Sequence, residues 1–149
     1  MCYTFDVPRV PKSKPFSIRL SQTTDRFVTA EARRTRRSKG AVVEALTEEA
    51  ARMRRFPGIG FRGEDPMREA WVLGTGLDVW ELIEMLQDYG SPERLIEEAD
   101  LPTRAVEVAR AYYASYPDEI DEAIAENRRP LSELRELYPF AGVTLVDDE

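Results

Sequence analysis

The spacing of hydrophobic residues changes, early in the chain, from the period of a strand to that of a helix. Apolar and polar residues alternate over FSIRLS, residues 16–21, and this alternation predicts a short β-strand. One face of this strand is apolar and consists of Phe16, Ile18 and Leu20. The other face is polar and consists of Ser17, Arg19 and Ser21.

Two helices are predicted after this strand. Ser21 suits the N-cap of a helix that begins near Gln22 and ends between Thr35 and Arg37. Ser38 suits the N-cap of a second helix, along which apolar residues recur at helical spacing: Val42, Val43, Leu46, Ala50 and Met53.

One short strand with two helices cannot satisfy the hydrogen bonds of its own edge or cover its own apolar face. A second copy of the chain solves both problems, because the two strands then pair antiparallel across a twofold axis and four helices enclose them. We therefore expect a homodimer or a higher even oligomer. The expected dimer core is Phe16, Ile18, Leu20, Val42, Val43 and Leu46.

Residues 56–129 are predicted to form a separate helical domain with a short β-hairpin. Ile59 and Phe61 mark one short strand, residues 68–73 form a second candidate, and the segment between them is turn-like. Helices are predicted over residues 78–90, from Ser91 and Pro92, over residues 103–116 and from Pro117. The expected fold class is therefore mainly α with small β elements.

The break at residues 100–102 joins two of these helices behind a longer one, which is the spacing of a helix-turn-helix motif. In such a motif, residues 103–116 would contact DNA. That segment has few positive charges, however, and residues 56–129 contain 7 Lys/Arg against 17 Asp/Glu. Repulsion from phosphates therefore favours a helix-turn-helix-like bundle core over a second DNA-reading helix.

Charge is distributed unevenly behind the net value of −7. Residues 1–55 contain 13 Lys/Arg and 6 Asp/Glu, whereas residues 130–149 contain 1 and 5. A basic region can neutralise DNA phosphates, whereas an acidic one would repel them. We therefore expect different partners for the two parts of the chain. The alternative is that the charges are ordinary solvated surface charges whose uneven distribution has no function.

The composition argues against an enzyme. The chain has no histidine and one cysteine, which excludes imidazole acid–base chemistry, histidine-dependent nucleophiles and Cys/His zinc sites. We expect no catalytic residues, no cofactor and no metal, and a carboxylate-dependent metal enzyme is the remote alternative. No apolar run fits a membrane span or a signal peptide, so a cytoplasmic protein without a membrane partner is expected.

The predicted DNA-binding domain, residues 16–55, resembles the ribbon-helix-helix family of repressors and antitoxins. The resemblance lies in FSIRLS, the helical stretch after it and SKGAVVEAL. It implies that the polar face of the paired strands enters the DNA major groove, where Ser17 and Arg19 read bases and Ser21 lies on the same face. Arg36 occupies the turn between the helices, where the family commonly has glycine.

Further residues extend this predicted DNA-binding surface. The N-terminus of the second helix, at Ser38 and Lys39, is expected to hold a phosphate through its amides and its dipole. Other positive charges lie beside it and in an N-terminal arm, residues 1–15, that is expected to be flexible: Arg36, Arg37, Lys12 and Lys14.

The acidic domain, residues 56–129, resembles a small helical domain of Vap-type antitoxins that often follows a ribbon-helix-helix domain. The resemblance covers about residues 52–129 and is carried by RMRRFPGIGFRG, AWVLGTGLDVWELIEMLQDYG and AVEVARAYYASYPDEIDEAIAENR. It implies no catalytic residues and a cognate toxin, commonly a PIN-like ribonuclease. An acidic surface would complement the basic field of such a nuclease.

Apolar and aromatic residues of the acidic domain and of a C-terminal acidic tail, residues 130–149, are candidate anchors for the toxin. Trp71 and Tyr113 are the candidates in the domain, whereas core packing is more natural for Trp80 and Tyr112. The tail repeats apolar residues at helical spacing and then reads as extended over residues 140–146. Its candidates are Leu134, Leu137, Tyr138 and Phe140. Folding of the tail back onto its own domain is an equal alternative.

These patterns together predict the antitoxin of a type II toxin–antitoxin pair. The dimeric N-terminal domain would bind operator DNA and repress transcription, and the acidic C-terminal part would neutralise the toxin. The alternative is a stand-alone ribbon-helix-helix transcriptional regulator whose helical domain senses a ligand or oligomerises.

Overall fold

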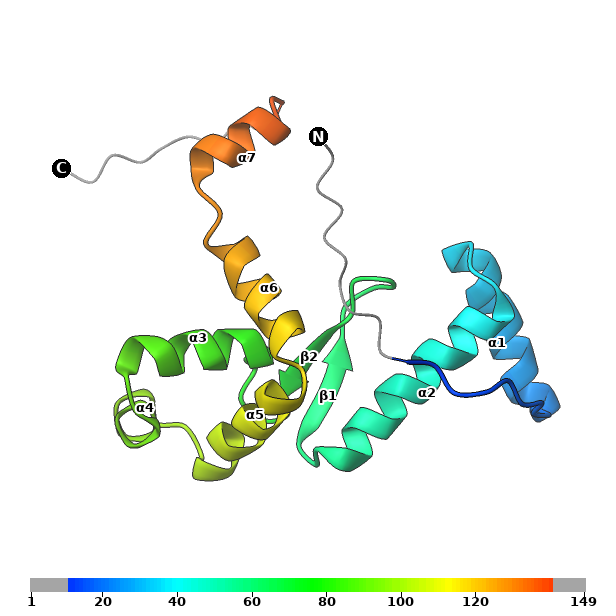
Figure 1. Ribbon diagram of the computed structural model, residues 1–149, viewed down its shortest axis with the longest axis horizontal. Coiled ribbons are helices and arrows are strands. Elements are labelled where there is room, and N and C mark those ends of the chain that lie inside the picture. The colour runs from blue at the N-terminus through cyan, green and yellow to red at the C-terminus, as the bar shows by residue number, and fades with distance from the viewer. Residues whose placement is uncertain (1–10, 141–149) are drawn as a thin grey trace. The chain divides into compact units, whose positions relative to one another are not determined.

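Two compact units make up the chain. The structure is a computed structural model that describes residues 11–140, and Figure 1 labels its helices and strands. Contacts between residues define a head unit, which ends at Val42, and a body unit, which begins at Val43. The division falls inside a helix, so the second half of that helix belongs with the body unit.

Both helices of the head unit begin where capping serines predict. α1 spans Gln22–Thr35, and α2 spans Lys39–Arg55 and continues into the body unit. The Ser21 hydroxyl accepts a hydrogen bond from the Thr24 amide at 3.2 Å, and the Ser38 hydroxyl accepts one from the Ala41 amide at 3.1 Å. These bonds satisfy amides that have no partner within a helix, so the predicted caps and helix starts are confirmed.

The turn between α1 and α2 depends on Arg36, which adopts a left-handed backbone conformation with φ 54° and ψ 41°. The Arg36 amide and the Arg37 amide both donate to the Ala32 carbonyl and so close the helix. Because side chains with a Cβ rarely adopt positive φ, this geometry explains why glycine is the residue expected at this turn.

Residues 16–21, predicted as a strand, form no strand within the single chain. A strand needs a hydrogen-bonded neighbour, and the predicted neighbour is the same segment of a second copy. The side chains of Phe16 and Ile18 are 79% and 54% exposed, so residues 11–140 leave these two members of the predicted apolar face largely uncovered. The pairing of this segment stays a prediction.

In the body unit, a β-hairpin follows the second half of α2, and this hairpin was predicted. β1, Ile59–Arg62, pairs antiparallel with β2, Glu69–Val72, and Ile59 lies opposite Val72. Five helices follow within the described part of the chain: α3 Val79–Tyr89, α4 Pro92–Ala99, α5 Thr103–Ser115, α6 Pro117–Asn127 and α7 Leu131–Leu137. α3 contacts β2, α4, α5 and α6, and Figure 1 shows α3, α5 and α6 gathered beside the hairpin.

Local signals define the helix ends of the body unit. Asp78 and Glu81 form a capping box at the start of α3, and Gly90 ends that helix with positive φ. Ser91 accepts from the Arg94 amide at 3.3 Å, with Pro92 in the first turn of α4. The predicted helix boundaries in this region are therefore confirmed.

The core of the body unit lies between the hairpin and helices α3 to α6. Phe56 and Tyr112 meet edge to face with their ring centroids 5.4 Å apart. The buried members of this core are Phe56, Ile59, Ala70, Val72, Val79, Leu82, Ile83, Leu95, Ala105, Val106, Ala109, Tyr112, Ile120 and Ile124.

The predicted fold class, mainly helical with a small sheet, is confirmed. Within residues 11–140, none of the helices combines the length and the apolar character that crossing a membrane requires.

Candidate nucleic-acid interface

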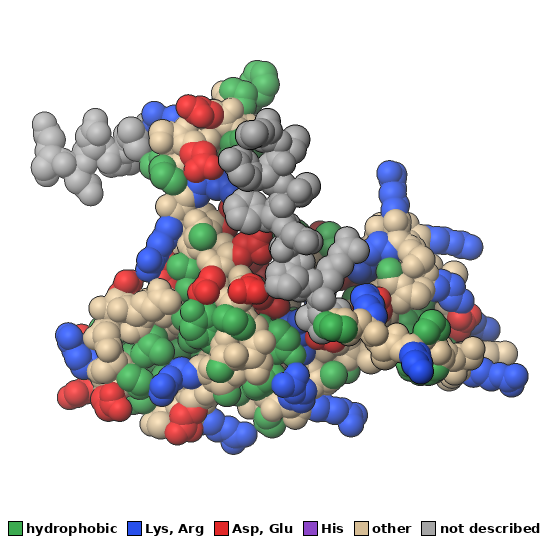
Figure 2. Space-filling model, viewed as in Figure 1, with side chains coloured by type: hydrophobic (Ala, Val, Ile, Leu, Met, Phe, Trp, Pro, Cys, Tyr) green, Lys and Arg blue, Asp and Glu red, His purple; other side chains and the backbone are tan. Residues whose placement is uncertain are grey.

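Positive charge dominates the described part of the head unit. Residues 11–42 contain nine Lys/Arg and two Asp/Glu. On the face shown in Figure 2, Lys and Arg side chains predominate over α1. This unit therefore carries the electrostatic character that phosphate binding needs.

Four of the predicted DNA-binding residues lie in the irregular segment before α1. These side chains are exposed: Lys12, Lys14, Ser17 and Arg19. The Arg19 guanidinium makes no hydrogen bond or ion pair with residues 11–140, so its donors point to solvent. Ser21, the next predicted residue, uses its hydroxyl to cap α1 and also donates to Thr24 Oγ1 at 3.0 Å.

The start of α2 is only partly available to a phosphate. The Ser38 hydroxyl is engaged by the Ala41 amide, and the Lys39 ammonium lies 2.6 Å from Asp25 Oδ1 of α1. The backbone amides at the first positions of a helix, here Lys39 and Gly40, have no acceptor within the helix. Their amides are therefore the groups best placed to bind an anion at this helix start.

Arginines surround the turn between the helices. Arg36 is exposed, and Arg37 donates from Nε to Thr35 Oγ1 at 3.2 Å. Glu31, one of the two acids, accepts two hydrogen bonds from Arg34, at 3.0 and 2.6 Å. These bonds lower the pKa of the Glu31 carboxyl, which therefore stays ionised. Its negative charge is offset by Arg34 of the same helix.

Two exposed arginines of α1 were missed by reasoning from the sequence. Arg26 and Arg33 are seven residues apart, so they lie on one face of the helix two turns from each other. Their spacing is visible in the sequence and identifies a basic stripe in addition to the predicted residues.

The residues predicted for the dimer core differ in exposure. Val42 is buried at 2% exposure within the single chain, and Leu20 and Val43 are half-buried. Three others remain largely open to solvent: Phe16, Ile18 and Leu46. Apolar side chains that are exposed together are typical of an interaction surface, and a second copy stays the predicted partner.

The candidate toxin anchors of the body unit are partly engaged within the chain. Trp71 is half-buried, with the Arg62 guanidinium 4.9 Å from its ring centroid. The Tyr113 hydroxyl donates to Asp121 at 2.7 Å, and this bond raises the pKa of that phenol. Tyr112 is fully buried and Trp80 packs half-buried against the core, as expected for both.

The tail candidates lie on α7 and just after it. α7 buries no residue, and Leu134 is half-buried. The other three candidates are exposed: Leu137 at 53%, Tyr138 at 59% and Phe140 at 101%. The rest of the predicted extended tail, residues 141–149, and most of the predicted arm, residues 1–10, lie outside the described residues.

Arg52 of α2 lies at the centre of an unpredicted network within the body unit. Its Nη1 donates to the Tyr112 hydroxyl and to Glu119 Oε2, both at 2.7 Å, and its guanidinium lies 3.8 Å from the centroid of the Tyr116 ring. Burial alone would lower the pKa of the Arg52 guanidinium. The hydrogen bonds to Glu119 and Glu48 outweigh the effect of burial and raise this pKa above its usual value. This arginine therefore joins α2 to α5 and α6, and is not available to a phosphate.

Comparisons with known proteins identify no relative: no family model, no curated protein and no solved structure matches the chain.

Proposed function

We propose that this chain is the antitoxin of a type II toxin–antitoxin pair, with a head unit that binds operator DNA as a ribbon-helix-helix dimer. The observation that carries the proposal is the combination found in residues 11–42. An apolar face, Phe16 and Ile18, is exposed at strand spacing and directly precedes two helices, and this part of the chain holds nine Lys/Arg against two Asp/Glu.

Dimerisation follows from the exposed apolar face. In a paired ribbon, Phe16, Ile18 and Leu20 turn inward, and alternation then turns Ser17 and Arg19 outward to the major groove. Arginine is suited to a bidentate contact with guanine, and the Arg19 guanidinium is not engaged by the described residues. The exposed arginines Arg26, Arg33 and Arg36 add charge that steers the unit to DNA.

The acidic body unit and its tail are the proposed toxin-binding part. Residues 56–129 hold 17 acids and 7 bases, so this part of the chain has a clear surplus of negative charge. A PIN-like ribonuclease must attract RNA through basic residues, and an acidic antitoxin surface can bind to the same basic residues. The exposed side chains of Leu137, Tyr138 and Phe140 supply the apolar anchors.

The DNA-binding half is tested by gel shifts on the DNA upstream of the gene that encodes the chain. Arg19→Ala is expected to reduce discrimination between this DNA and a scrambled duplex by about 1–3 kcal/mol, because a base contact is lost. Arg110→Ala, which removes an exposed arginine of α5, is the matched control and leaves discrimination unchanged. Equal behaviour of the two variants contradicts the ribbon assignment.

The toxin-binding half is tested by co-expression with the protein encoded next to the gene. The full chain is expected to co-purify with that protein and to suppress its ribonuclease activity. Leu137→Asp together with Tyr138→Asp is expected to weaken the complex while operator binding is retained. If the chain binds the operator but no adjacent product, the alternative, a stand-alone transcriptional regulator, replaces the antitoxin proposal.

A further inference from the structure

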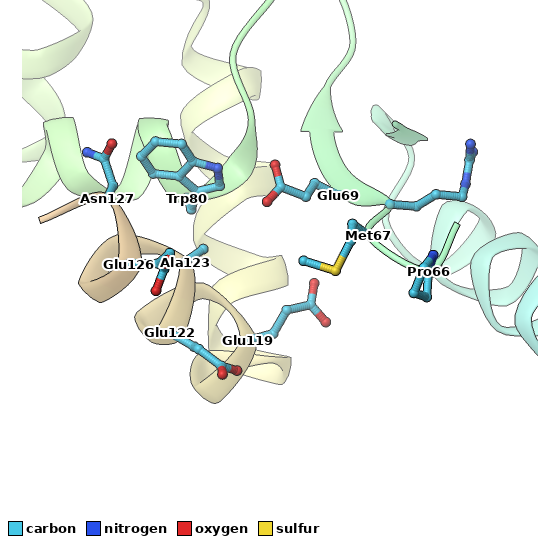
Figure 3. A pocket seen from close by; sticks show the side chains of 10 residues that line it. Pro66, Met67, Glu69, Trp80, Glu119, Glu122, Ala123, Glu126 and Asn127 are labelled. Atoms are coloured by element: carbon cyan, nitrogen blue, oxygen red, sulfur yellow. The ribbon is translucent and has the colours of Figure 1, made fainter. Parts of the chain in front are cut away.

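An open recess of about 720 Å³ lies in the body unit between the β-hairpin and α6. Figure 3 shows Met67 and Glu69 on the hairpin side, Trp80 of α3 at one end, and α6 opposite them. The Glu119 carboxylate of α6 points toward Met67, whereas that of Glu122 points away from it. Its volume is within the range of small-ligand sites in proteins.

One part of the lining is apolar. Pro66, Met67, Trp80 and Ala123 contribute to it, and the Met67 side chain is 78% exposed although it is large and hydrophobic. Trp80 is half-buried, with one part against the core and the rest available to the recess. A tryptophan ring and a thioether offer polarisable surface to an aliphatic chain or a cation.

The carboxylates of the lining differ in whether they already have a basic partner. Glu119 is bound by Arg52 and by the Tyr112 hydroxyl, and Glu126 forms an ion pair with Arg129. Glu122 makes no hydrogen bond or ion pair with residues 11–140. The one basic residue of the lining, Arg68, is bound to Glu49 at 2.6 Å, so it does not offset the negative charge.

Glu69 lies in an environment that disfavours its charge. Partial burial and the nearby negative charge of Asp78 raise the pKa of its carboxyl, and a hydrogen bond with Trp80 only partly compensates. A cation placed in the recess would relieve this repulsion.

The spacing of the acids does not fit a metal ion. Within the described residues, no three acidic or cysteine side chains come close enough together to hold a metal. The acids instead flank an apolar surface, so a ligand that has both a cationic end and an aliphatic stem satisfies both parts of the lining.

We propose that this recess binds a guanidinium or primary ammonium group carried on an aliphatic chain, with the stem against Trp80 and Met67 and the cation beside Glu69, where the negative charges of α6 also attract it. The ligand is either a free amine or a basic side chain of a protein partner. The proposal concerns the body unit alone and holds whether or not the chain is an antitoxin.

The test uses the full chain and isothermal titration with three probes. They are agmatine, a blocked Gly-Arg-Gly peptide, and the same peptide with citrulline, which keeps the shape of arginine without its charge. Saturable binding of agmatine or the arginine peptide is expected, with none for the citrulline peptide. Binding of agmatine alone identifies a free amine as the ligand, and binding of the peptide identifies a protein side chain.

Substitutions in the lining show whether the probes bind in the recess. Glu69→Gln with Glu122→Gln is expected to weaken binding at least about fivefold. Glu93→Gln with Glu97→Gln on α4 removes the same charge from exposed positions away from the recess and leaves binding unchanged. Equal weakening in both double variants, binding of the citrulline peptide, or no saturation of either cationic probe overturns the proposal. A Trp71→Phe background, in which Trp80 is the sole tryptophan, gives an independent fluorescence readout.

Discussion

The body unit completes its own hydrophobic core, whereas the head unit does not. Fourteen buried residues of the body unit form one cluster, and α3 to α6 and the hairpin all contribute to it. In the described part of the head unit, the buried apolar side chains are Val28 and Val42, while Phe16, Ile18 and Phe27 are more than half exposed. The body unit therefore has what it needs to be stable as a monomer, and the head unit is expected to gain stability by association.

Loss of a core aromatic residue should produce the largest effect. Tyr112→Ala is expected to lower the free energy of unfolding by about 3–5 kcal/mol, because it leaves a cavity beside Phe56 and removes a hydroxyl that bridges Arg52 and Glu119. Urea unfolding measures the loss. Tyr138→Ala, at an exposed position after α7, is the control and should change little. A small effect of Tyr112→Ala would contradict a self-sufficient body core.

Local signals in the sequence were enough to predict most element boundaries. Ser21, Ser38 and Ser91 each cap the helix that follows them, because a capping hydroxyl acts on an amide three residues ahead and needs no tertiary contact. The hairpin was predictable for a similar reason, because its two strands follow each other in the sequence with only a turn-like segment between them.

Contacts between distant segments were not predictable in this way. Arg52 binds Tyr112 and Glu119, which are 60 and 67 residues further along the chain, and no periodicity relates such positions. The recess was also invisible, because Glu69, Trp80 and Glu122 come from three separate elements. The pairing of residues 16–21 depends on a second copy, so no contact within one chain determines it.

The second prediction concerns association of the head unit. Ile18→Asp is expected to weaken the dimer roughly a hundredfold, about 2.7 kcal/mol, because it places a carboxylate in the apolar face of the ribbon. Sedimentation velocity measures the association, and the urea transition of the body unit should be unchanged.

A neighbouring position provides the control for this prediction. Ser17→Asp introduces the same side chain one residue away, on the opposite face of the predicted strand, and should leave the dimer intact. If both variants dissociate equally, the loss of the dimer is due to general charge repulsion and not to disruption of an apolar interface. If neither dissociates, the head unit is stable without the ribbon, and the contrast between the units fails.

Removal of one capping hydroxyl in each unit has a smaller expected effect. Ser38→Ala and Ser91→Ala each remove a bond to a backbone amide, at 3.1 and 3.3 Å, and each should cost about 1 kcal/mol. Ser91→Ala should lower the unfolding transition of the body unit. Ser38→Ala should speed amide exchange at the start of α2 and leave that transition in place. Asn at either position retains a cap and should restore most of the stability; a shared response of both units would show that they unfold together.

The smallest expected effect compares two glutamates whose surroundings shift the carboxyl pKa in opposite directions. Hydrogen bonds from Arg34 lower the pKa of Glu31 in the head unit, whereas burial and the charge of Asp78 raise that of Glu69 in the body unit. Carboxyl NMR titration is therefore expected to show Glu69 protonating at a higher pH than Glu31.

The two shifts predict opposite effects on stability. Glu31 stabilises the folded state above the ordinary pKa of glutamate, and this contribution disappears as the pH falls through its lowered folded pKa. Ionised Glu69 destabilises the folded state at neutral pH, and the cost disappears as the pH falls through its raised folded pKa toward the ordinary value. Glu31→Gln should therefore lower stability at neutral pH and Glu69→Gln should raise it, with both differences vanishing in acid. Arg34 determines the sign for Glu31, and burial together with the charge of Asp78 determines it for Glu69. An equal sign for both variants would therefore mean that these local contacts do not control the two carboxyls.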